Sequence, residues 1–125
     1  MVRPLSPYLQ VLRKMQITSL LSISHRVSGV FLFFGVLFYS WCFALYVFFT
    51  DFVIAFSSRQ CFILINKAFT FLFLSSFTYH FFNGIRHLLW DFGINLTNKG
   101  VSITGVIVVV LFLLSTLSLA FLVFY

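Results

Sequence analysis

The sequence predicts an all-α membrane protein with three transmembrane helices. Hydrophobic residues make up 62% of its 125 residues and charged residues only 8%, whereas a soluble domain carries about a quarter charged residues. Three apolar runs are each long enough to cross the roughly 30 Å core of a bilayer as a helix. These runs show no alternation of polar and apolar residues, which argues against a β-barrel. Helices are required because lipid offers no hydrogen bonds to unpaired backbone N–H and C=O groups.

The first segment, residues 1–17, is predicted to be an arm at the membrane interface. Its prolines and basic residues are Arg3, Pro4, Pro7, Arg13 and Lys14. Basic side chains at the edge of an apolar run suit anionic lipid headgroups. The net charge of +6 is therefore assigned to contact with membrane lipid, and no nucleic acid is expected as a partner.

The first span is predicted over about residues 19–49, because no charged residue occurs in Val27–Phe49. That run exceeds the about 20 residues that a membrane-crossing helix needs. A short loop is expected next, over Thr50–Asn66, where Asp51 and Arg59 interrupt the apolar sequence.

The second span is expected over about residues 68–89, followed by Trp90 where aromatic residues meet the headgroups. Its polar interruptions are His80, Asn83, Arg86 and His87. A polar loop, Asp91–Ser102, leads to the third span, over about residues 103–125, which carries no charge.

The placement of basic residues predicts the orientation, because Lys and Arg concentrate on the inner side of a membrane. The N-terminal side and the second loop have Arg3, Arg13, Lys14, Arg26, Arg86 and Lys99, and the first-loop side has only Arg59 and Lys67. The N-terminus and the second loop are therefore expected inside, and the C-terminus outside.

Few residues are available for bond-making chemistry. The only carboxylates are Asp51 and Asp91, far apart in the sequence, so paired carboxylates for acid–base hydrolysis are excluded. Cys42 and Cys61 form no C-x-x-C motif and are interpreted as apolar fillers. No catalytic residue is predicted.

The second span carries a stripe of His80, Gly84, His87 and Asp91, which fall on one helical face at about 100° per residue. Ionisable residues inside a membrane are expensive and usually functional. Three interpretations stay open for His80: a neutral imidazole hydrogen-bonded across helices, a proton relay without a neighbouring carboxylate, or a haem iron ligand. In the last, Gly84 leaves room for a flat macrocycle, and His87 and Arg86 could meet its propionates.

A second cluster opens the first span, with Ser22, His25, Arg26 and Gly29. Arg26 could simply extend to the headgroups while Ser22 packs between helices. Alternatively, the hydroxyl and the guanidinium form a polar pocket for a carbonyl or carboxylate oxygen.

Three motifs connect these clusters to a known family. They are R-P-L-S-P-Y-L-Q (Arg3–Gln10), S-x-x-H-R-x-S-G (Ser22–Gly29) and H-x-x-N-G-I-R-H-L-x-W-D-x-G (His80–Gly93). In this order the chain resembles the cytochrome b membrane-anchor subunit of succinate dehydrogenase, respiratory complex II. The resemblance covers nearly the whole chain, which would form a single membrane-anchor domain over residues 1–125.

The resemblance implies three helices that pack with a second small anchor subunit around one b-type haem. It implies His80 as an axial ligand of the haem iron and His25, Arg26 and His87 near the haem propionates. Ser22 and Arg26 would bind ubiquinone. An iron–sulfur subunit and a flavoprotein subunit would complete the assembly.

The implied function is electron transfer from succinate, through iron–sulfur clusters, to ubiquinone, in the respiratory chain and the tricarboxylic acid cycle. This chain would catalyse nothing alone. Its expected location is the mitochondrial inner membrane with the N-terminus in the matrix, or a bacterial cytoplasmic membrane. The alternatives are an anchor of a related quinol:fumarate reductase, or a non-redox membrane assembly or transport subunit.

Overall fold

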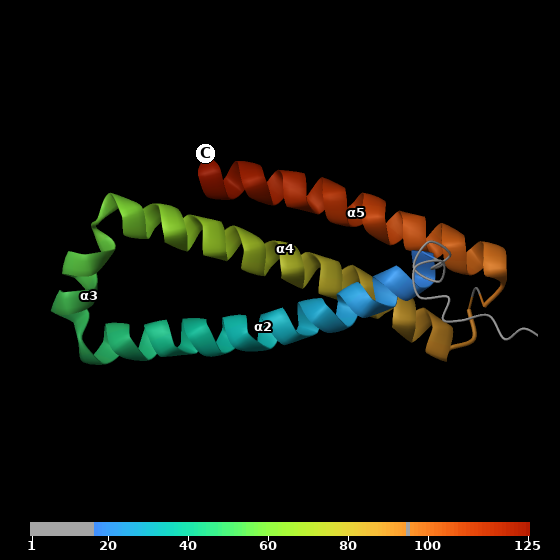
Figure 1. The fold of residues 1–125 in the computed structure, drawn as a ribbon, viewed down its shortest axis with the longest axis horizontal. Coiled ribbons are helices and arrows are strands. Elements are labelled where there is room, and N and C mark those ends of the chain that lie inside the picture. Colours follow the sequence, from blue (N-terminus) through green and yellow to red (C-terminus); the bar gives the residue numbers. More distant parts are fainter. Residues whose placement is uncertain (1–16, 95) are drawn as a thin grey trace, which may run out of the picture.

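The computed structural model describes residues 17–94 and 96–125, and this part of the chain is helical throughout, without strands. Its helices are α2 (Ile17–Phe48), α3 (Thr50–Ser57), α4 (Gln60–Asp91) and α5 (Asn98–Phe124) (Figure 1). The predicted interfacial arm, residues 1–17, lies outside the described residues apart from Ile17, which already belongs to α2.

Three of the helices are long and apolar enough to cross a membrane, over Ser19–Phe48, Gln60–Asp91 and Lys99–Phe124. The all-α class with three spans is therefore confirmed. Among the described residues, Leu21 and Val108 are the only buried hydrophobic side chains. Many of the other large apolar side chains are exposed, where lipid or other subunits can contact them.

The prediction of a loop over Thr50–Asn66 was wrong. Thr50–Ser57 forms α3, and α4 already begins at Gln60 rather than near residue 68. Asp51 lies in the first turn of α3, where a carboxylate favours a helix N-terminus. The break is confined to the residues around Arg59, whose extended backbone separates the two helices. Most polar residues at this end therefore belong to helices, and only Ser58 and Arg59 lie between α3 and α4.

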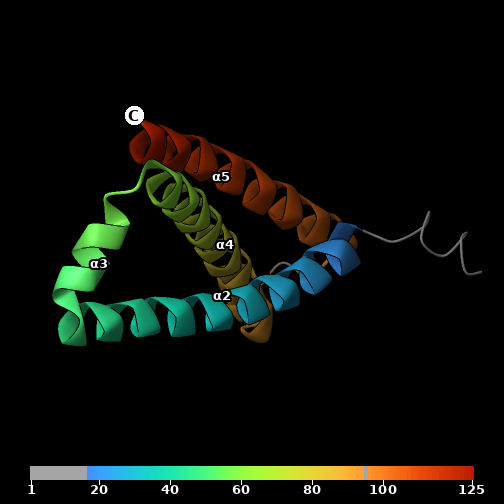
Figure 2. The same cartoon turned by 60° about the vertical axis from the view of Figure 1, so that its left-hand side comes forward.

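Helix α4 lies in the middle and packs against both α2 and α5 (Figures 1 and 2). Toward one end of the molecule α2 and α4 diverge, and α3 bridges the gap between them. At the opposite end the start of α2, the end of α4 and the start of α5 converge. We call this the convergent end; most of the polar side chains discussed below lie toward it.

The reversal between α4 and α5 depends on Gly93, which has a φ of 74°. This left-handed conformation is one that glycine adopts without steric cost. The Ile94 amide donates to the carbonyl of Leu89 at 3.0 Å, which closes the C-terminus of α4. The Thr97 side chain accepts a hydrogen bond from the Gly100 amide at 3.1 Å and caps α5. The chain therefore turns back sharply and α5 returns along α4.

Candidate functional site

Three histidine rings meet where α2 crosses α4. The His25 ring on α2 stacks on the His80 ring of α4, with centroids 3.9 Å apart and planes 12° apart. The His87 ring lies 5.2 Å from the His25 ring. The sequence placed His80 and His87 on one stripe, and the helix crossing adds His25 to the same group.

Two glycines lie beside the stacked rings, and at one of them a side chain would crowd an imidazole. A Cβ atom on Gly29 would lie 3.0 Å from Cε1 of His80, which is tighter than most real contacts. A Cβ atom on Gly84 would lie 3.6 Å from Nε2 of His25. The backbone of each helix therefore approaches an imidazole of the other, and Gly84 faces His25.

The hydrogen bonds of His80 define which ring nitrogen carries the proton. Its Nδ1 lies 3.1 Å from the carbonyl oxygen of His25 and 3.0 Å from Oγ of Ser28. A carbonyl oxygen can only accept, so Nδ1 must be the protonated nitrogen. The lone pair is then on Nε2, which is the form in which an imidazole binds a metal.

Two buried nitrogens have no hydrogen-bond partner among the described residues, Nε2 of His25 and Nε1 of Trp90. An unpaired buried polar atom costs about 1–3 kcal/mol. Nε2 of His25 lies at the histidine group itself. A partner beyond the described residues is therefore needed to complete its hydrogen bonding.

Ser22 and Arg26 lie one turn apart on α2, yet they line different hollows. Ser22 lines a hollow of about 360 Å³ together with Ser19, Trp90, Leu96 and Val101. Arg26, which is exposed, lines one of about 440 Å³ with Val27, Val30, Phe31 and Phe34. In the part of the chain that the structure describes, Ser22 and Arg26 therefore line separate hollows.

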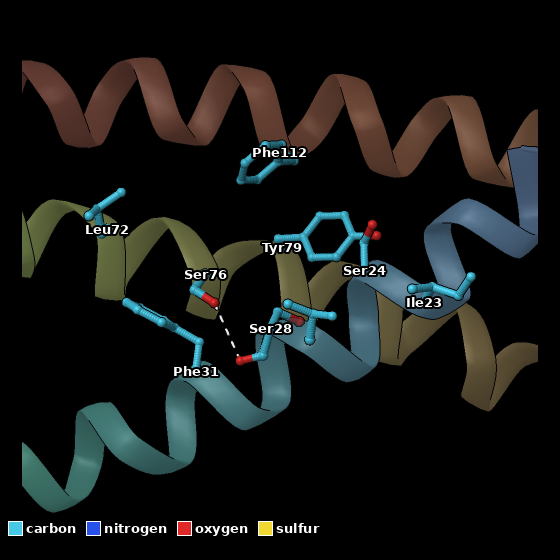
Figure 3. A pocket seen from close by; sticks show the side chains of 9 residues that line it. Ile23, Ser24, Ser28, Phe31, Leu72, Ser76, Tyr79 and Phe112 are labelled. Carbon is cyan, nitrogen blue, oxygen red and sulfur yellow. Dashed lines mark hydrogen bonds between the residues drawn. The ribbon is translucent and has the colours of Figure 1, made fainter.

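A third hollow, of about 540 Å³, lies between α2, α4 and α5 (Figure 3). Its polar lining residues include Ser28, Ser76 and Tyr79. Their hydroxyls already donate to carbonyl oxygens: Ser28 to His25, Ser76 to Ser28 and Tyr79 to Leu21. These three hydroxyls are therefore already bonded within the chain, and Ser24 is the fourth polar residue of a mostly apolar lining.

Comparison with known proteins gives this arrangement a family. The family model described as "Succinate dehydrogenase/Fumarate reductase transmembrane subunit" matches residues 1–120. The chain belongs to this family. It is 44% identical over 119 residues to the succinate dehydrogenase cytochrome b556 subunit of Rickettsia bellii, covering 94% of this chain and 90% of the relative.

Relatives in other organisms carry similar names. The succinate dehydrogenase cytochrome b560 subunit of Reclinomonas americana is 36% identical over 124 residues, covering 92% of this chain and 82% of the relative. That of Marchantia polymorpha is 40% identical over 117 residues, covering 84% and 79%. A succinate dehydrogenase cytochrome b membrane subunit is therefore what the family and its members support, and a cytochrome b subunit implies a haem.

The histidine group fits a haem of such a cytochrome b subunit. His80 presents Nε2 as the unprotonated nitrogen, as an iron ligand must. The buried Nε2 of His25 has no partner within the described chain and could donate to a propionate once protonated. Gly29 and Gly84 keep side chains away from both rings. The histidine group thus offers one imidazole nitrogen able to bind iron and one buried nitrogen without a partner among the described residues.

Arg86 lies on the side of α4 that faces α5. Under the haem interpretation of the sequence it could have met propionates, but in the structure the residue is 2% exposed and its guanidinium bonds to α5. It donates to Thr104 Oγ1 at 3.3 Å and to the Val101 carbonyl at 3.2 Å, and it lies 4.1 Å from the centre of the Trp90 ring. Arg86 is about 100° around the helix from His87. The two adjacent residues therefore contact different helices, Arg86 α5 and His87 α2.

Asn83 was named in the sequence without a role, and it is the most buried polar side chain described, at 0% exposed. It donates to the Leu21 carbonyl at 3.0 Å and accepts from Arg86 at 3.2 Å. The signal was available, because an amide at membrane depth needs partners. Asn83 and Arg86 together connect the three spans at the convergent end.

Proposed function

We propose that this chain is the membrane-anchoring, haem b-binding and ubiquinone-binding subunit of a succinate dehydrogenase, complex II. In that assembly electrons pass from succinate through iron–sulfur clusters to ubiquinone, in the respiratory chain and the tricarboxylic acid cycle. The observation that carries the proposal is the hydrogen bonding of His80, which leaves Nε2 to bind iron. The family membership supports the same conclusion.

The partners in this proposal are a second small anchor subunit, an iron–sulfur subunit and a flavoprotein subunit. The second anchor would supply the other axial ligand, because the His25 ring stacks face to face on the His80 ring at 3.9 Å and so lies beside that ligand rather than across the iron from it. The proposed location is the mitochondrial inner membrane with the N-terminus in the matrix, or else a bacterial cytoplasmic membrane.

His80 would hold the haem iron through Nε2, and His25, Arg26 and His87 would contact the propionates. A haem with two histidine ligands supplies one-electron storage and transfer, because it has no open coordination site. The unpartnered Nε2 of His25 supports this assignment, since a propionate oxygen would complete its hydrogen bonding. Arg26 is exposed and would contribute a permanent positive charge toward the same carboxylates.

Ser22 and Arg26 would bind ubiquinone at the convergent end. The Ser22 hydroxyl can donate one hydrogen bond to a quinone oxygen, and Arg26 favours the negative charge that develops as the quinone is reduced. Because Ser22 and Arg26 line separate hollows, we propose that the headgroup lies across the ridge between them. Surfaces of the partner subunits would then close the site.

The second candidate is an anchor of a quinol:fumarate reductase, because the matched family includes both enzymes. The names of the relatives favour succinate dehydrogenase. A non-redox assembly or transport subunit gives no reason for a group of three histidines, two of them stacked, at the crossing of two spans.

The test is to purify the assembled complex through a tag on this chain and record its reduced-minus-oxidised spectrum. The wild type should contain a low-spin b-type haem and co-purify with the partner subunits. His80→Tyr should abolish or shift that spectrum, while His87→Tyr, the matched control on the same helix face, should keep the haem low-spin. An intact His80→Tyr complex with an unchanged spectrum would contradict the assignment.

A further inference from the structure

One hydroxyl of α2 contacts the proposed iron ligand directly. Ser28 is 7% exposed, and its Oγ lies 3.0 Å from Nδ1 of His80. The same Oγ donates its single proton to the carbonyl of His25 at 2.7 Å. Since that proton is committed, Oγ can only accept from His80. The Nδ1–H of His80 therefore meets two acceptors on α2, the carbonyl of His25 and the hydroxyl of Ser28.

We infer that Ser28 is a positioning residue that fixes the ring plane and the tautomer of His80 for iron ligation. This inference rests on the proposed function. The last torsion of a histidine side chain is broad, and one acceptor at Nδ1 would let the ring swing about the hydrogen bond. A second acceptor 3.0 Å away, on the same helix, restricts that swing.

The remaining contacts of His80 define the same ring plane. The His25 ring covers one face at 3.9 Å, and the backbone at Gly29 lies against the Cε1 edge. Ser28 and the carbonyl of His25 hold the nitrogen next to that edge. The imidazole is therefore set on α4 but oriented by α2, before any group from another subunit is added.

Ordinary packing does not account for the position of Ser28. Serine hydroxyls in helices commonly bond to a carbonyl of the preceding turn. Ser75 does only this, with its hydroxyl 2.7 Å from the Phe71 carbonyl, and it is buried to the same degree, at 8% exposed. Ser28 makes the equivalent bond and in addition contacts His80. Ser75→Ala is thus a matched control for Ser28→Ala.

Loss of the Ser28 acceptor should weaken the bond between His80 and the iron without breaking it. A hydrogen bond at Nδ1 raises the basicity of a metal-bound histidine, and removing such partners typically costs 10–100-fold in metal affinity. In Ser28→Ala the haem should stay low-spin, but its electron paramagnetic resonance g-values should shift as the ring plane relaxes. The midpoint potential should rise, because a weaker axial donor stabilises ferric iron less.

The experiment compares wild type, Ser28→Ala, Ser75→Ala and Ser28→Thr in the assembled complex. Ser28→Ala should lose haem to excess apomyoglobin about tenfold faster than wild type, and Ser75→Ala should not. Ser28→Thr should restore wild-type behaviour, because its hydroxyl can make the same bonds and its methyl group has room in the adjoining hollow of about 540 Å³. If Ser28→Ala does not assemble, Ser28→Cys, with its weaker acceptor sulfur, should show smaller changes of the same sign.

Unchanged g-values, potential and haem loss in Ser28→Ala, or equal changes in Ser75→Ala, would overturn the inference. The His80→Tyr spectrum separates this outcome from a failure of the proposed function. If His80→Tyr loses the low-spin signal while Ser28→Ala matches wild type, only the role of Ser28 is wrong. If His80→Tyr keeps the signal, the proposed ligand is wrong and the role of Ser28 is wrong with it.

Discussion

The side-chain amide of Asn83 donates a 3.0 Å hydrogen bond to the carbonyl oxygen of Leu21, and this bond joins α4 to α2. The oxygen of the same amide accepts from Arg86, which in turn joins α4 to α5. Few hydrophobic side chains are buried in the described chain, and these polar bonds add to the contact between the spans. In a membrane, helices associate through van der Waals packing and through such interhelical hydrogen bonds.

Asn83→Leu should destabilise the packing of the three spans. The substitution removes the acceptor of one Arg86 N–H and one of the donors to the Leu21 carbonyl. Leaving a buried polar group without its partner costs about 1–3 kcal/mol of stability. Thermal unfolding in detergent, followed by loss of co-purifying subunits, should show a lower midpoint than wild type. Asn66→Leu is the matched control, because Asn66 is exposed on the same helix. Equal midpoints for the two variants would show that the Asn83 network contributes nothing.

Arg86→Lys should destabilise the α4–α5 pair although it keeps the positive charge. A lysine cannot reproduce the three directional bonds of the guanidinium or its flat contact with Trp90. Limited proteolysis of the second loop in detergent should be faster than in wild type. Arg59→Lys, at an exposed position between α3 and α4, is the control. The second loop of this variant should be cleaved at the wild-type rate. Wild-type protection in Arg86→Lys would mean that charge alone suffices.

Gly29→Ala should disturb the haem more than Gly84→Ala does. The new Cβ at Gly29 would meet Cε1 of His80 at 3.0 Å, so the ring must move, whereas the Cβ at Gly84 would make an ordinary 3.6 Å contact with His25. The low-spin spectrum and the haem content per complex measure the difference. The reverse order of effects would indicate that His80 does not occupy the position described.

Ser22→Ala should reduce quinone reduction by roughly one to two powers of ten at limiting quinone, because a hydrogen bond to a charged group contributes about 1.5–3 kcal/mol. Arg26→Leu should reduce it as well. Succinate oxidation with a dye that accepts electrons upstream should survive in both variants. Ser24→Ala, in an exposed position on the same helix, is the control. A joint fall of quinone and dye activity would instead indicate a role in assembly.

The two ends of the bundle should face opposite sides of the membrane. In a background without Cys42 and Cys61, Ser58→Cys should react with a membrane-impermeant maleimide added to intact mitoplasts or spheroplasts. Lys99→Cys should react only after the membrane is opened, since the distribution of Lys and Arg predicts the second loop inside. Both positions are exposed in the structure, so reagent access decides the result. Labelling of Lys99→Cys from outside would reverse the proposed orientation.

Hydropathy was sufficient to predict the three spans, because length and composition alone decide whether a helix can cross a bilayer. It failed for α3, since Asp51 and its polar neighbours suit a helix end at a membrane surface as well as a loop. The stripe of His80 and His87 followed from helical period. Its partner His25 did not, because the stacking depends on where α2 crosses α4, and no local pattern encodes a crossing point.

Arg86 could have been placed correctly from the same period. It lies about 100° from His87 but only about 60° from Asn83 around the helix. Helical period therefore places Arg86 on the same side of α4 as Asn83. The sequence analysis grouped it with its neighbour in the chain instead. The identity of its α5 partners, Thr104 and the Val101 carbonyl, could not be predicted, because it depends on the tight reversal at Gly93.

The α5 partners of Arg86 lie only 15 and 18 positions further along the chain. An arginine that enters the lipid without partners is costly, by up to roughly 2.5–3.5 kcal/mol at a helix centre, although Arg86 lies nearer the end of α4. A helical hairpin closed at Gly93 would let the guanidinium enter the lipid with its acceptors already in place. We therefore expect α4 and α5 to be inserted during synthesis as one unit, with α2 docking onto α4 as a separate step.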